Sequence, residues 1–492
     1  MELALTIEGR RGLGDQLYRK LREAILTGRL APADRLPSSR ELAQRLGVSR
    51  NIVNQAYERL AGEGYLEARV GSGTFVSTAV RSPVHSERPG ARAPLRLTRW
   101  ARSIVDPVYT PPTRDLPYDF RPGTPEVAFF PLEAWRRISA RHLRQSTRDL
   151  ASYGDTAGYP PLRRAISRYL AHSRAVLAPP ERIMITSGSQ QALDLLARVL
   201  IEPGDTVVVE EPAYPAAVAA FRAAGARLHP VPVDDQGIRV DLLPDRATLA
   251  YVTPSHQFPL GVPLALPRRQ SLLEWAARRR IVIVEDDYDS EFRYAGRPLE
   301  SLQGLDRAGV VVYLGTFSKV LFPALRLGYL VVPPTLLRPV LAAKWLADRH
   351  TPLLEQRILA SFIQEGHFAR HLRRMQKVYA ERRHVLLQAL TTVAPWITPV
   401  PSIAGLHLTA WLNEGVDPEA LIARASATGV GLYSIAPFFQ RAPRPGLIFG
   451  FGRCGTPEIR EGVRRLRNVL MTMKPLRSHA GAMSNLRCPP FE

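Results

Sequence analysis

Lys319 is the residue of this chain best suited to covalent chemistry. It lies just after an apolar run at residues 310–314, so we expect it near the end of a β-strand. Burial and cationic neighbours lower the pKa of a lysine amine and make it nucleophilic, which suits an imine with an aldehyde cofactor. Thr316, Ser318 and Arg326 flank the lysine and could hold an anion such as a phosphate. The alternative interpretation is a polar loop between two buried strands.

An acidic cluster at residues 285–289 follows a second strand-like run, at residues 280–284. A carboxylate at such a position, here Asp286, is costly to desolvate unless a cation accompanies it. The protonated nitrogen of a pyridine ring would be such a cation, and the carboxylate would keep the ring an electron sink. The alternatives are a solvated acidic turn and a divalent-metal loop. No histidine cluster or calcium-loop spacing accompanies these residues in the sequence, so we expect no metal site.

Two further groups of residues follow strand-like runs. Residues 187–189, with the sequence Ser-Gly-Ser, connect a run at 182–186 with a helical pattern that begins at Ala192. Small residues before a helix expose backbone N–H groups that can hold a phosphate, although similar turns often only cap a helix. Tyr214 follows the run at 206–212, where its ring could stack on a heteroaromatic ring or simply pack in the core.

These residues need a scaffold that brings several strand ends together. After Tyr118, strand-like and helical patterns alternate along the chain, which predicts an α/β domain with a mostly parallel sheet. Ligands of such sheets bind at the carboxyl ends of the strands, which is where these polar residues lie.

The first eighty residues have a different pattern. Apolar residues at helical spacing predict a helix over residues 17–26 and another within residues 37–47, with an N-cap serine and a terminating glycine. A third helix begins at Ser49, and a β-hairpin follows Gly64. This order predicts a winged helix-turn-helix whose second helix enters the major groove of DNA. The alternative is a small helical subdomain whose arginines are only solvated.

Composition limits the class of protein further. The chain of 492 residues has a formal net charge of +21, which suggests a polyanionic partner. No apolar run reaches membrane-spanning length, and the N-terminus lacks a signal-peptide pattern. Only Cys454 and Cys488 occur, which is too few for a disulfide framework or a cysteine metal site. We therefore expect a cytoplasmic protein that does not enter a membrane.

The N-terminal pattern resembles the winged helix-turn-helix of GntR-type regulators. Residues 1–80 have a net charge of only +3, so the pattern rather than the charge locates this domain. The resemblance implies that the following residues contact DNA: Arg40, Ser49, Arg50, Asn51, Asn54 and Gly71.

Residues 118–473 resemble fold-type I pyridoxal-phosphate aminotransferases, with specific matches at residues 284–292 and around Lys319. With the N-terminal head, the whole chain resembles the MocR/GabR subfamily of bacterial transcription regulators. The resemblance implies pyridoxal 5′-phosphate (PLP) as the cofactor and Lys319 as its Schiff-base lysine. It also implies that Asp286 pairs with the pyridine nitrogen and that Tyr288 bonds the phenolic oxygen.

The same resemblance implies further roles. Tyr214 would stack on the cofactor ring, Tyr153 would cross a dimer interface to the partner's phosphate, and Arg453 would hold the carboxylate of an effector. The residues expected around the phosphate are Ser187, Gly188, Ser189, Thr316, Ser318 and Arg326.

Two positions depart from the family pattern. Enzymes of this fold commonly carry asparagine before a Pro-Thr-Gly turn, whereas Phe258 occupies that position here, leaving His256 or Gln257 as possible substitutes. The GABA-responsive regulator carries an arginine two residues after its stacking tyrosine, whereas this chain has Ala216. GABA is therefore not the effector that we expect.

We thus expect a DNA-binding domain at residues 12–80, a Pro/Arg-rich linker at 81–115, a PLP-binding domain at 116–473 and a disordered tail at 474–492. The protein would be a homodimeric transcription regulator that binds a double-stranded operator with two half-sites. It would sense PLP, a small amino compound, or both, through an aldimine at Lys319. The alternative is a genuine aminotransferase with an accessory DNA-binding domain.

Overall fold

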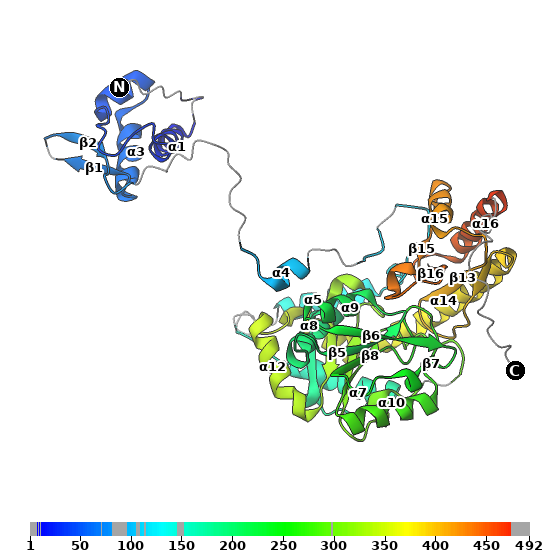
Figure 1. The fold of residues 1–492 in the computed structure, drawn as a ribbon. Coiled ribbons are helices and arrows are strands. Elements are labelled where there is room, and N and C mark those ends of the chain that lie inside the picture. Colours follow the sequence, from blue (N-terminus) through cyan, green and yellow to red (C-terminus); the bar gives the residue numbers. More distant parts are fainter. Residues whose placement is uncertain are drawn as a thin grey trace. The chain divides into compact units, whose positions relative to one another are not determined.

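The computed structural model describes residues 7, 9, 11–69, 71–80, 96–104, 109–112, 115–144, 152–296 and 299–473. The chain forms two compact units that divide between residues 96 and 97 (Figure 1). The expected linker lies across this division: its residues 81–95 are outside the described part, and those described from 97 onward belong to the second unit. The expected disordered tail also lies outside the described residues.

The first unit contains three helices of a helix-turn-helix domain. Both α1 (Leu13–Leu26) and α2 (Ser39–Leu46) pack against α3 (Arg50–Gly62). The side chain of Ser38 caps α2 by accepting a hydrogen bond from a backbone N–H at 3.2 Å. Gly47 ends the same helix in the left-handed conformation, with φ 66°. The predicted N-cap serine and terminating glycine are therefore confirmed.

A short hairpin completes the first unit. β1 (Leu66–Arg69) pairs antiparallel with β2 (Gly73–Val76), and Gly71 lies in the connecting turn with φ 77°. The hairpin closes a small core around the helices, formed by Leu17, Leu21, Leu42, Val53, Leu60, Leu66 and Val76. The unit is thus the winged helix-turn-helix that the sequence predicts.

A large mixed sheet lies at the centre of the second unit (Figure 1). Its strands, in spatial order, are β4 (Ile183–Thr186), β11 (Gly328–Val331), β10 (Val311–Thr316), β9 (Val282–Asp287), β8 (Leu249–Val252), β5 (Thr206–Glu211), β6 (Arg227–Asp234) and β7 (Gly237–Ile238). All neighbours from β10 to β6 are parallel, whereas β11 runs antiparallel to both of its neighbours and β7 to β6. The mostly parallel sheet was predicted.

Helices cover both faces of this sheet. Alternate residues of a strand point to opposite faces, so Val312 and Leu314 pack in one core and Val311 and Tyr313 on the other side. The first of these cores includes α8 (Gly188–Leu200), α9 (Pro215–Ala223) and α12 (Pro334–Asp348). The opposite face is covered by α7 (Pro160–Arg174) and α10 (Leu266–Arg279).

A smaller antiparallel sheet lies in the C-terminal part of the unit. Its spatial order is β12 (Ile397–Pro399), β13 (His407–Leu412), β16 (Gly446–Gly450) and β15 (Tyr433–Ser434). The helices of this part are α14 (His367–Leu390), α15 (Pro418–Ala427) and α16 (Thr456–Thr472). In addition, β14 (Val430–Gly431) pairs in parallel with β3 (Tyr118–Asp119), which ties the start of the unit to its end.

The remaining described elements are further helices and single 3₁₀ turns. The other α-helices are α4 (Arg99–Ser103), α5 (Leu132–Arg144), α11 (Leu302–Leu305) and α13 (Leu353–Gln364). Single 3₁₀ turns occur at η1 (Pro180–Arg182), η2 (Val240–Leu242), η3 (Pro323–Leu325), η4 (Thr391–Val393) and η5 (Ala436–Phe438). Within the described ranges, no helix is both long and apolar enough to cross a lipid bilayer.

The acidic cluster at residues 285–289 does not begin as a solvated turn. Strand β9 continues to Asp287, so the first carboxylates of the cluster belong to the strand and are buried. Glu285 accepts hydrogen bonds from two backbone N–H groups at 2.9 Å, and Asp287 pairs with Arg174 at 2.7 Å. These partners offset part of the cost of burying the two carboxylates, although burial still raises the pKa of Glu285 to about 7.

Candidate functional site

A cavity of about 290 Å³ lies at the carboxyl ends of the central parallel strands. This is the edge at which open α/β sheets bind ligands. The predicted site residues that line the cavity are Ser189, Tyr214, Asp286, Tyr288, Thr316, Ser318, Lys319 and Arg326. Folding therefore brings together residues that the sequence places on four separate strand ends.

Lys319 follows β10 and points its amine into this cavity. Its Nζ donates a hydrogen bond to the backbone carbonyl of Gly123 at 2.7 Å. Burial, with smaller contributions from Arg121 and Arg326, lowers the pKa of the Lys319 amine against the opposing effect of two aspartates. A lowered pKa raises the share of unprotonated amine, which is the nucleophilic form.

Asp286 supplies a buried carboxylate with an unused oxygen. Its Oδ2 accepts a hydrogen bond from the hydroxyl of Tyr251 at 2.7 Å, whereas Oδ1 has no partner among the described residues. Burial raises the pKa of the Asp286 carboxyl to about 7. A cationic N–H group beside Oδ1 would satisfy the orphaned atom and favour the ionised carboxylate.

The start of α8 faces the cavity beside Arg326. The first N–H groups of a helix have no intrahelical acceptor and attract anions, and Ser189 presents this end of α8 to the cavity. The guanidinium of Arg326 donates to the carbonyl of Ser187 at 3.1 Å. Gly188 has φ 78° and leaves room for this guanidinium, because a Cβ there would lie 2.9 Å from it. Ser187 and Gly188 thus shape the site without lining the cavity.

Hydroxyl groups and an arginine in a left-handed backbone conformation also line the cavity. The backbone N–H of Ser318 donates to Oγ1 of Thr316 at 3.1 Å, which holds the turn before Lys319. Arg326 itself has φ 51°, a left-handed conformation that costs a non-glycine residue about 1 kcal/mol. Such local strain is often retained at functional positions, and the Arg326 side chain lines the cavity.

Phe258 joins several rings into one wall of the cavity. Its ring meets those of Tyr214 at 5.6 Å, Tyr288 at 5.7 Å, His407 at 5.5 Å and Phe438 at 5.3 Å between centroids. Edge-to-face contacts at these distances are favourable. Tyr214 thus lines the cavity in contact with Phe258, and its stacking role stays a prediction.

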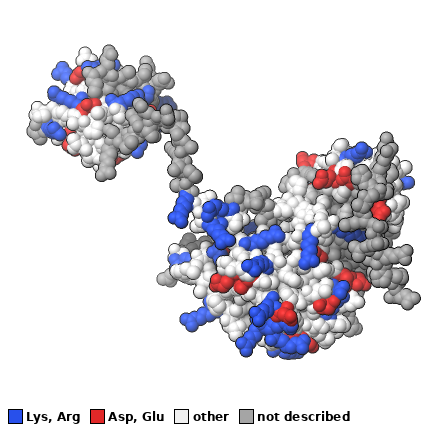
Figure 2. All heavy atoms as spheres, viewed as in Figure 1, with Lys and Arg blue, Asp and Glu red and all other residues white. Residues whose placement is uncertain are grey.

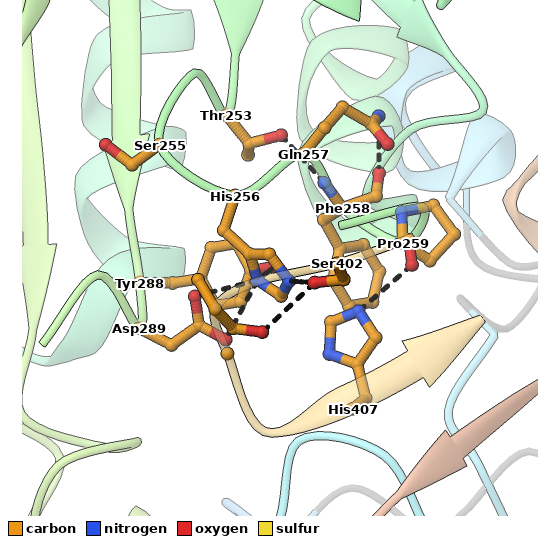
Figure 3. Close-up of polar contacts among 12 residues, drawn as sticks. Thr253, Ser255, His256, Gln257, Phe258, Pro259, Tyr288, Asp289, Ser402 and His407 are labelled. Atoms are coloured by element: carbon orange, nitrogen blue, oxygen red, sulfur yellow. Dashed lines mark hydrogen bonds and ion pairs between the residues drawn. The ribbon is translucent and has the colours of Figure 1, made fainter. Parts of the chain in front are cut away.

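Tyr288 belongs to a buried polar network that sequence reasoning found only in part (Figure 3). His256 Nδ1 lies 2.9 Å from the Tyr288 hydroxyl and 3.0 Å from the Asp289 carboxylate, while Nε2 lies 3.1 Å from the Ser402 hydroxyl. Burial and the Asp289 charge raise the pKa of Tyr288 well above its usual value, so the phenol stays protonated. Of the two suggested substitutes for asparagine, His256 reaches the cavity through Tyr288. The Gln257 amide instead donates to the carbonyls of Pro212 and Phe258.

His256, Asp289 and His407 offer possible ligand atoms within 4.8 Å of one another. However, His407 Nε2 donates to the carbonyl of Pro259 at 3.0 Å, and burial holds the pKa of His407 well below its usual value. Both histidines and the aspartate are thus engaged in hydrogen bonds (Figure 3). We interpret the cluster as a rigid wall that positions Tyr288.

Like Ser187 and Gly188, two further predicted residues do not line the cavity. Tyr153 is 76% exposed, and the guanidinium of Arg349 lies 4.1 Å from its ring centroid. Its role at a partner's phosphate therefore stays a prediction about an assembled dimer. Arg453 is exposed beyond β16 and does not line the cavity, so within one chain the geometry gives no support for its role with an effector carboxylate.

Sequence reasoning missed other parts of the lining. Tyr251, which bonds Asp286, was visible only as part of a polar strand-to-loop transition. Tyr109, Thr110 and Pro111 fall in the segment expected to be a solvated linker, yet all three line the cavity. Phe438 reaches it from a 3₁₀ turn more than a hundred residues after Lys319. A local sequence pattern does not predict that residues this far apart line the same cavity.

The predicted DNA contacts lie on the first unit. Arg40 is exposed at the start of α2. Ser49, Arg50 and Asn51 are exposed at the start of α3, and Asn54 is half-buried one turn further on. Gly71 is exposed at the tip of the hairpin. Figure 2 shows several Lys and Arg side chains on the visible face of this unit. This arrangement suits a recognition helix in the major groove with phosphate contacts beside it.

The cavity suits a phosphorylated pyridine aldehyde. An anion site formed by α8 and Arg326 would hold the phosphate. The orphaned Oδ1 of Asp286 would accept from the ring N–H, and the amine of Lys319 can attack an aldehyde. Tyr214 lines the same cavity and would contact the ring. Donor types and burial therefore fit PLP.

Two family profiles match the chain. Residues 13–76 match the family described as bacterial regulatory proteins, gntR family, and residues 123–420 match aminotransferase class I and II. These matches correspond to the winged helix-turn-helix and to the large-sheet unit.

Known regulators match this chain over most of its length. The chain is 41% identical to the probable rhizopine catabolism regulatory protein MocR of Rhizobium meliloti, covering 93% of this chain and 94% of that protein. It is 32% identical to the HTH-type pyridoxine biosynthesis transcriptional regulator PdxR of Corynebacterium glutamicum, and the match covers 89% of this chain and 91% of that protein.

Solved structures resemble the second unit. LysN, the α-aminoadipate aminotransferase of Thermus thermophilus in complex with N-(5′-phosphopyridoxyl)-L-leucine, has a TM-score of 0.70 and 34% identity over 76% of this chain and 97% of that one. The kynurenine aminotransferase of Pyrococcus horikoshii in complex with PMP has a TM-score of 0.67 and 32% identity. This match covers 73% of this chain and 91% of that one. The fold and these complexes indicate PLP as the cofactor. The chain therefore belongs to the MocR/GabR subfamily of GntR-type transcription regulators, DNA-binding proteins whose body has the fold of PLP-dependent aminotransferases.

Proposed function

We propose that this regulator senses PLP, a small amino compound, or both, in the cavity of its second unit. One observation carries the proposal. A partly buried lysine, a carboxylate with an orphaned oxygen and an arginine-lined anion site share one cavity, in a chain that also has a winged helix-turn-helix. A body that served only as a scaffold would not need this set of costly groups.

The residues of the cavity have separate tasks in this proposal. When bound, PLP supplies an aldehyde that reacts with primary amines and a ring that withdraws electrons. Lys319 provides the amine, and its lowered pKa keeps part of it unprotonated. Asp286 holds the ring N–H through Oδ1, and Arg326 with the start of α8 holds the phosphate. Tyr288 is kept in place by His256.

The first unit would read DNA as part of a homodimer. One winged helix contacts only a short half-site, so two copies are needed for an operator with two half-sites. In the dimer, Tyr153 of each chain would approach the phosphate of its partner. A ligand changes DNA affinity only if it binds the DNA-competent and DNA-incompetent conformations with different affinity. We place this protein in the cytoplasm, with a DNA-binding domain at 12–80 and a PLP-binding domain at 116–473. The segment 81–115 joins them, and its described residues from 97 onward pack with the second unit.

Chemical trapping tests the proposal. Borohydride reduction of the PLP-loaded full chain should leave the cofactor covalently attached to the peptide that contains Lys319. Removal of residues 1–80 should abolish operator binding and leave this attachment intact. Lys377, which is exposed on α14, is the matched lysine for a control substitution to alanine. Attachment at another lysine, or DNA binding that survives the deletion, would overturn the proposal.

A second candidate function is genuine transamination. The chain is 34% identical to the aromatic-amino-acid aminotransferase 1 of Thermococcus litoralis over 71% of this chain, and the cavity lining holds the lysine and aspartate that both uses require. An enzyme must also release its product and accept a second keto acid, whereas a sensor works best if its ligand stays bound. Counting keto acid formed per chain separates the two, because only an enzyme exceeds one product per cofactor by a wide margin.

A further inference from the structure

The end of the segment between the two parts of the chain forms one wall of the cavity. Tyr109, Thr110 and Pro111 all line it. The segment is anchored to the body, because Arg121 donates to the carbonyl of Pro111 at 2.9 Å and the Tyr433 hydroxyl donates to that of Pro112 at 3.3 Å. A ligand in the cavity can therefore touch the chain that leads back to the DNA-binding unit.

This wall is aromatic and continuous with the expected cofactor position. The Tyr109 ring meets Phe438 edge-on at 5.6 Å, and Phe438 meets Phe258 at 5.3 Å. Phe258 in turn contacts both Tyr214 and Tyr288. A ring or alkyl group placed here would lose its water to apolar surface, which is favourable.

The charges of the cavity disfavour a ligand carboxylate. Among the described lining residues, Lys319 and Arg326 are the only cations. Arg326 is assigned to the phosphate, and burial lowers the pKa of the Lys319 amine, which disfavours its charged form once a ligand amine has displaced it. Asp289 lines the cavity with a buried carboxylate, and burial keeps His407 neutral by lowering its pKa. The Arg121 guanidinium is outside the lining and bonds Pro111. An anionic group would thus be desolvated beside an anion without a cation of its own.

We propose that Tyr109, Phe258 and Phe438 form an effector subsite for a primary amine with an apolar, preferably aromatic, body and no carboxylate. The inference rests on the proposed amine-sensing function and names its ligand class. Contact between the effector body and Tyr109 biases the position of the segment at residues 109–112, and this differential contact changes DNA affinity. The exposed position of Arg453 is consistent with an effector that has no carboxylate.

A matched pair of ligands tests the chemical class. Phenethylamine and phenylalanine differ only by a carboxylate, and methylamine lacks the ring. In titrations of the PLP-loaded full chain followed by cofactor absorbance, phenethylamine should bind at least about tenfold more tightly than either, which is 1.4 kcal/mol. Titrations of free PLP provide the background. If phenylalanine binds as tightly as phenethylamine or more tightly, the proposed subsite is wrong. The ligand carboxylate would then be bound by Arg453 or by a residue of a partner chain.

Two aromatic residues of the same segment test the contact. Tyr109 lines the cavity, whereas Trp100 on α4 lines a separate depression with Ala197 and Ala220. Tyr109→Ala should weaken phenethylamine binding at least about tenfold and remove its effect on DNA affinity, with a much smaller loss for methylamine. Tyr109→Phe should retain both responses, and Trp100→Ala should behave as the wild type. Equal effects of Tyr109→Ala and Trp100→Ala overturn the contact.

The outcomes also separate this inference from the function beneath it. If methylamine changes the cofactor absorbance but phenethylamine gains no affinity, only the apolar subsite is wrong. If no amine changes either absorbance or DNA affinity, the amine-sensing function fails and the subsite fails with it.

Discussion

Two parts of the same cavity differ in where their residues come from. The part assigned to the cofactor uses Asp286 at the end of β9, Lys319 shortly after β10 and Arg326 just before β11. The aromatic wall uses Tyr109 and Phe438, which lie far apart in sequence and on no strand of the large sheet. The comparison suggests that the large sheet positions the reactive groups, whereas segments outside the sheet determine which ligand is selected.

The largest expected effect comes from removing the amine of the cofactor part. Lys319→Ala should abolish borohydride-stable attachment of PLP and every amine-dependent change in DNA affinity, because no other lysine lines the cavity among the described residues. DNA binding without ligand should persist. Lys377→Ala serves as the control. An amine response that survives in Lys319→Ala would show that sensing does not use this cavity.

The same comparison explains which features the sequence predicts. Strand ends are marked locally by an apolar run followed by polar residues, so Lys319, Asp286 and Tyr214 were found with the sheet that carries them. The contact of His256 with Ser402 spans 146 residues and leaves no local trace. Tyr109 lies in a Pro- and Arg-rich segment whose composition predicts only a solvated linker. Patterns of this kind do not report tertiary contacts.

The next effect concerns the orphaned carboxylate oxygen. Asp286→Asn keeps the shape of the side chain but removes its charge, so PLP should bind about tenfold to a hundredfold more weakly, the range expected for a charged hydrogen bond. Equilibrium titration with PLP measures this, with the exposed Asp235→Asn as control. Unchanged PLP affinity would mean that Asp286 does not face the ring nitrogen.

Asp286 also predicts a dependence of stability on pH. Burial raises the pKa of its carboxyl to about 7 in the folded chain, above the value of about 3.9 for an unfolded aspartate. The protonated group therefore favours folding at low pH, and this contribution is lost as the pH rises towards 7. Without PLP, Asp286→Asn should gain at least about 1 kcal/mol of unfolding free energy relative to the wild type between pH 5 and pH 8. An equal difference at both pH values would contradict this.

A smaller effect is expected on the DNA-binding unit. Arg50 is exposed at the start of α3, with Nε donating to the Ser39 hydroxyl at 3.2 Å. Arg50→Ala should weaken operator binding about tenfold and lower the slope of log affinity against log salt by about one, while PLP binding stays as in the wild type. Arg29→Ala, which removes an exposed arginine paired with Glu23, is the control. Equal losses in both variants would argue against a recognition role for α3.

The smallest effect should come from the network behind the aromatic wall. His256→Gln removes the ring that lies 2.9 Å from the Tyr288 hydroxyl but leaves the lining residues in place. We expect PLP affinity to change by less than about threefold, with a shift in the pH at which the cofactor absorbance changes. Ser402→Ala removes the hydroxyl that lies 3.1 Å from Nε2 of His256. It should shift the pH of the absorbance change in the same direction but by a smaller amount. An unshifted absorbance profile in His256→Gln would mean that His256 is only a packing residue.

The most direct test of the central claim measures DNA affinity and product formation on the same PLP-loaded chain. Operator affinity is determined with and without methylamine, phenethylamine and GABA, and keto acid is counted over many cofactor equivalents. The account predicts that at least one amine changes operator affinity about fivefold or more, within the usual range of allosteric coupling, with no sustained turnover. Sustained keto-acid production with unchanged operator affinity would contradict it and make the protein an enzyme.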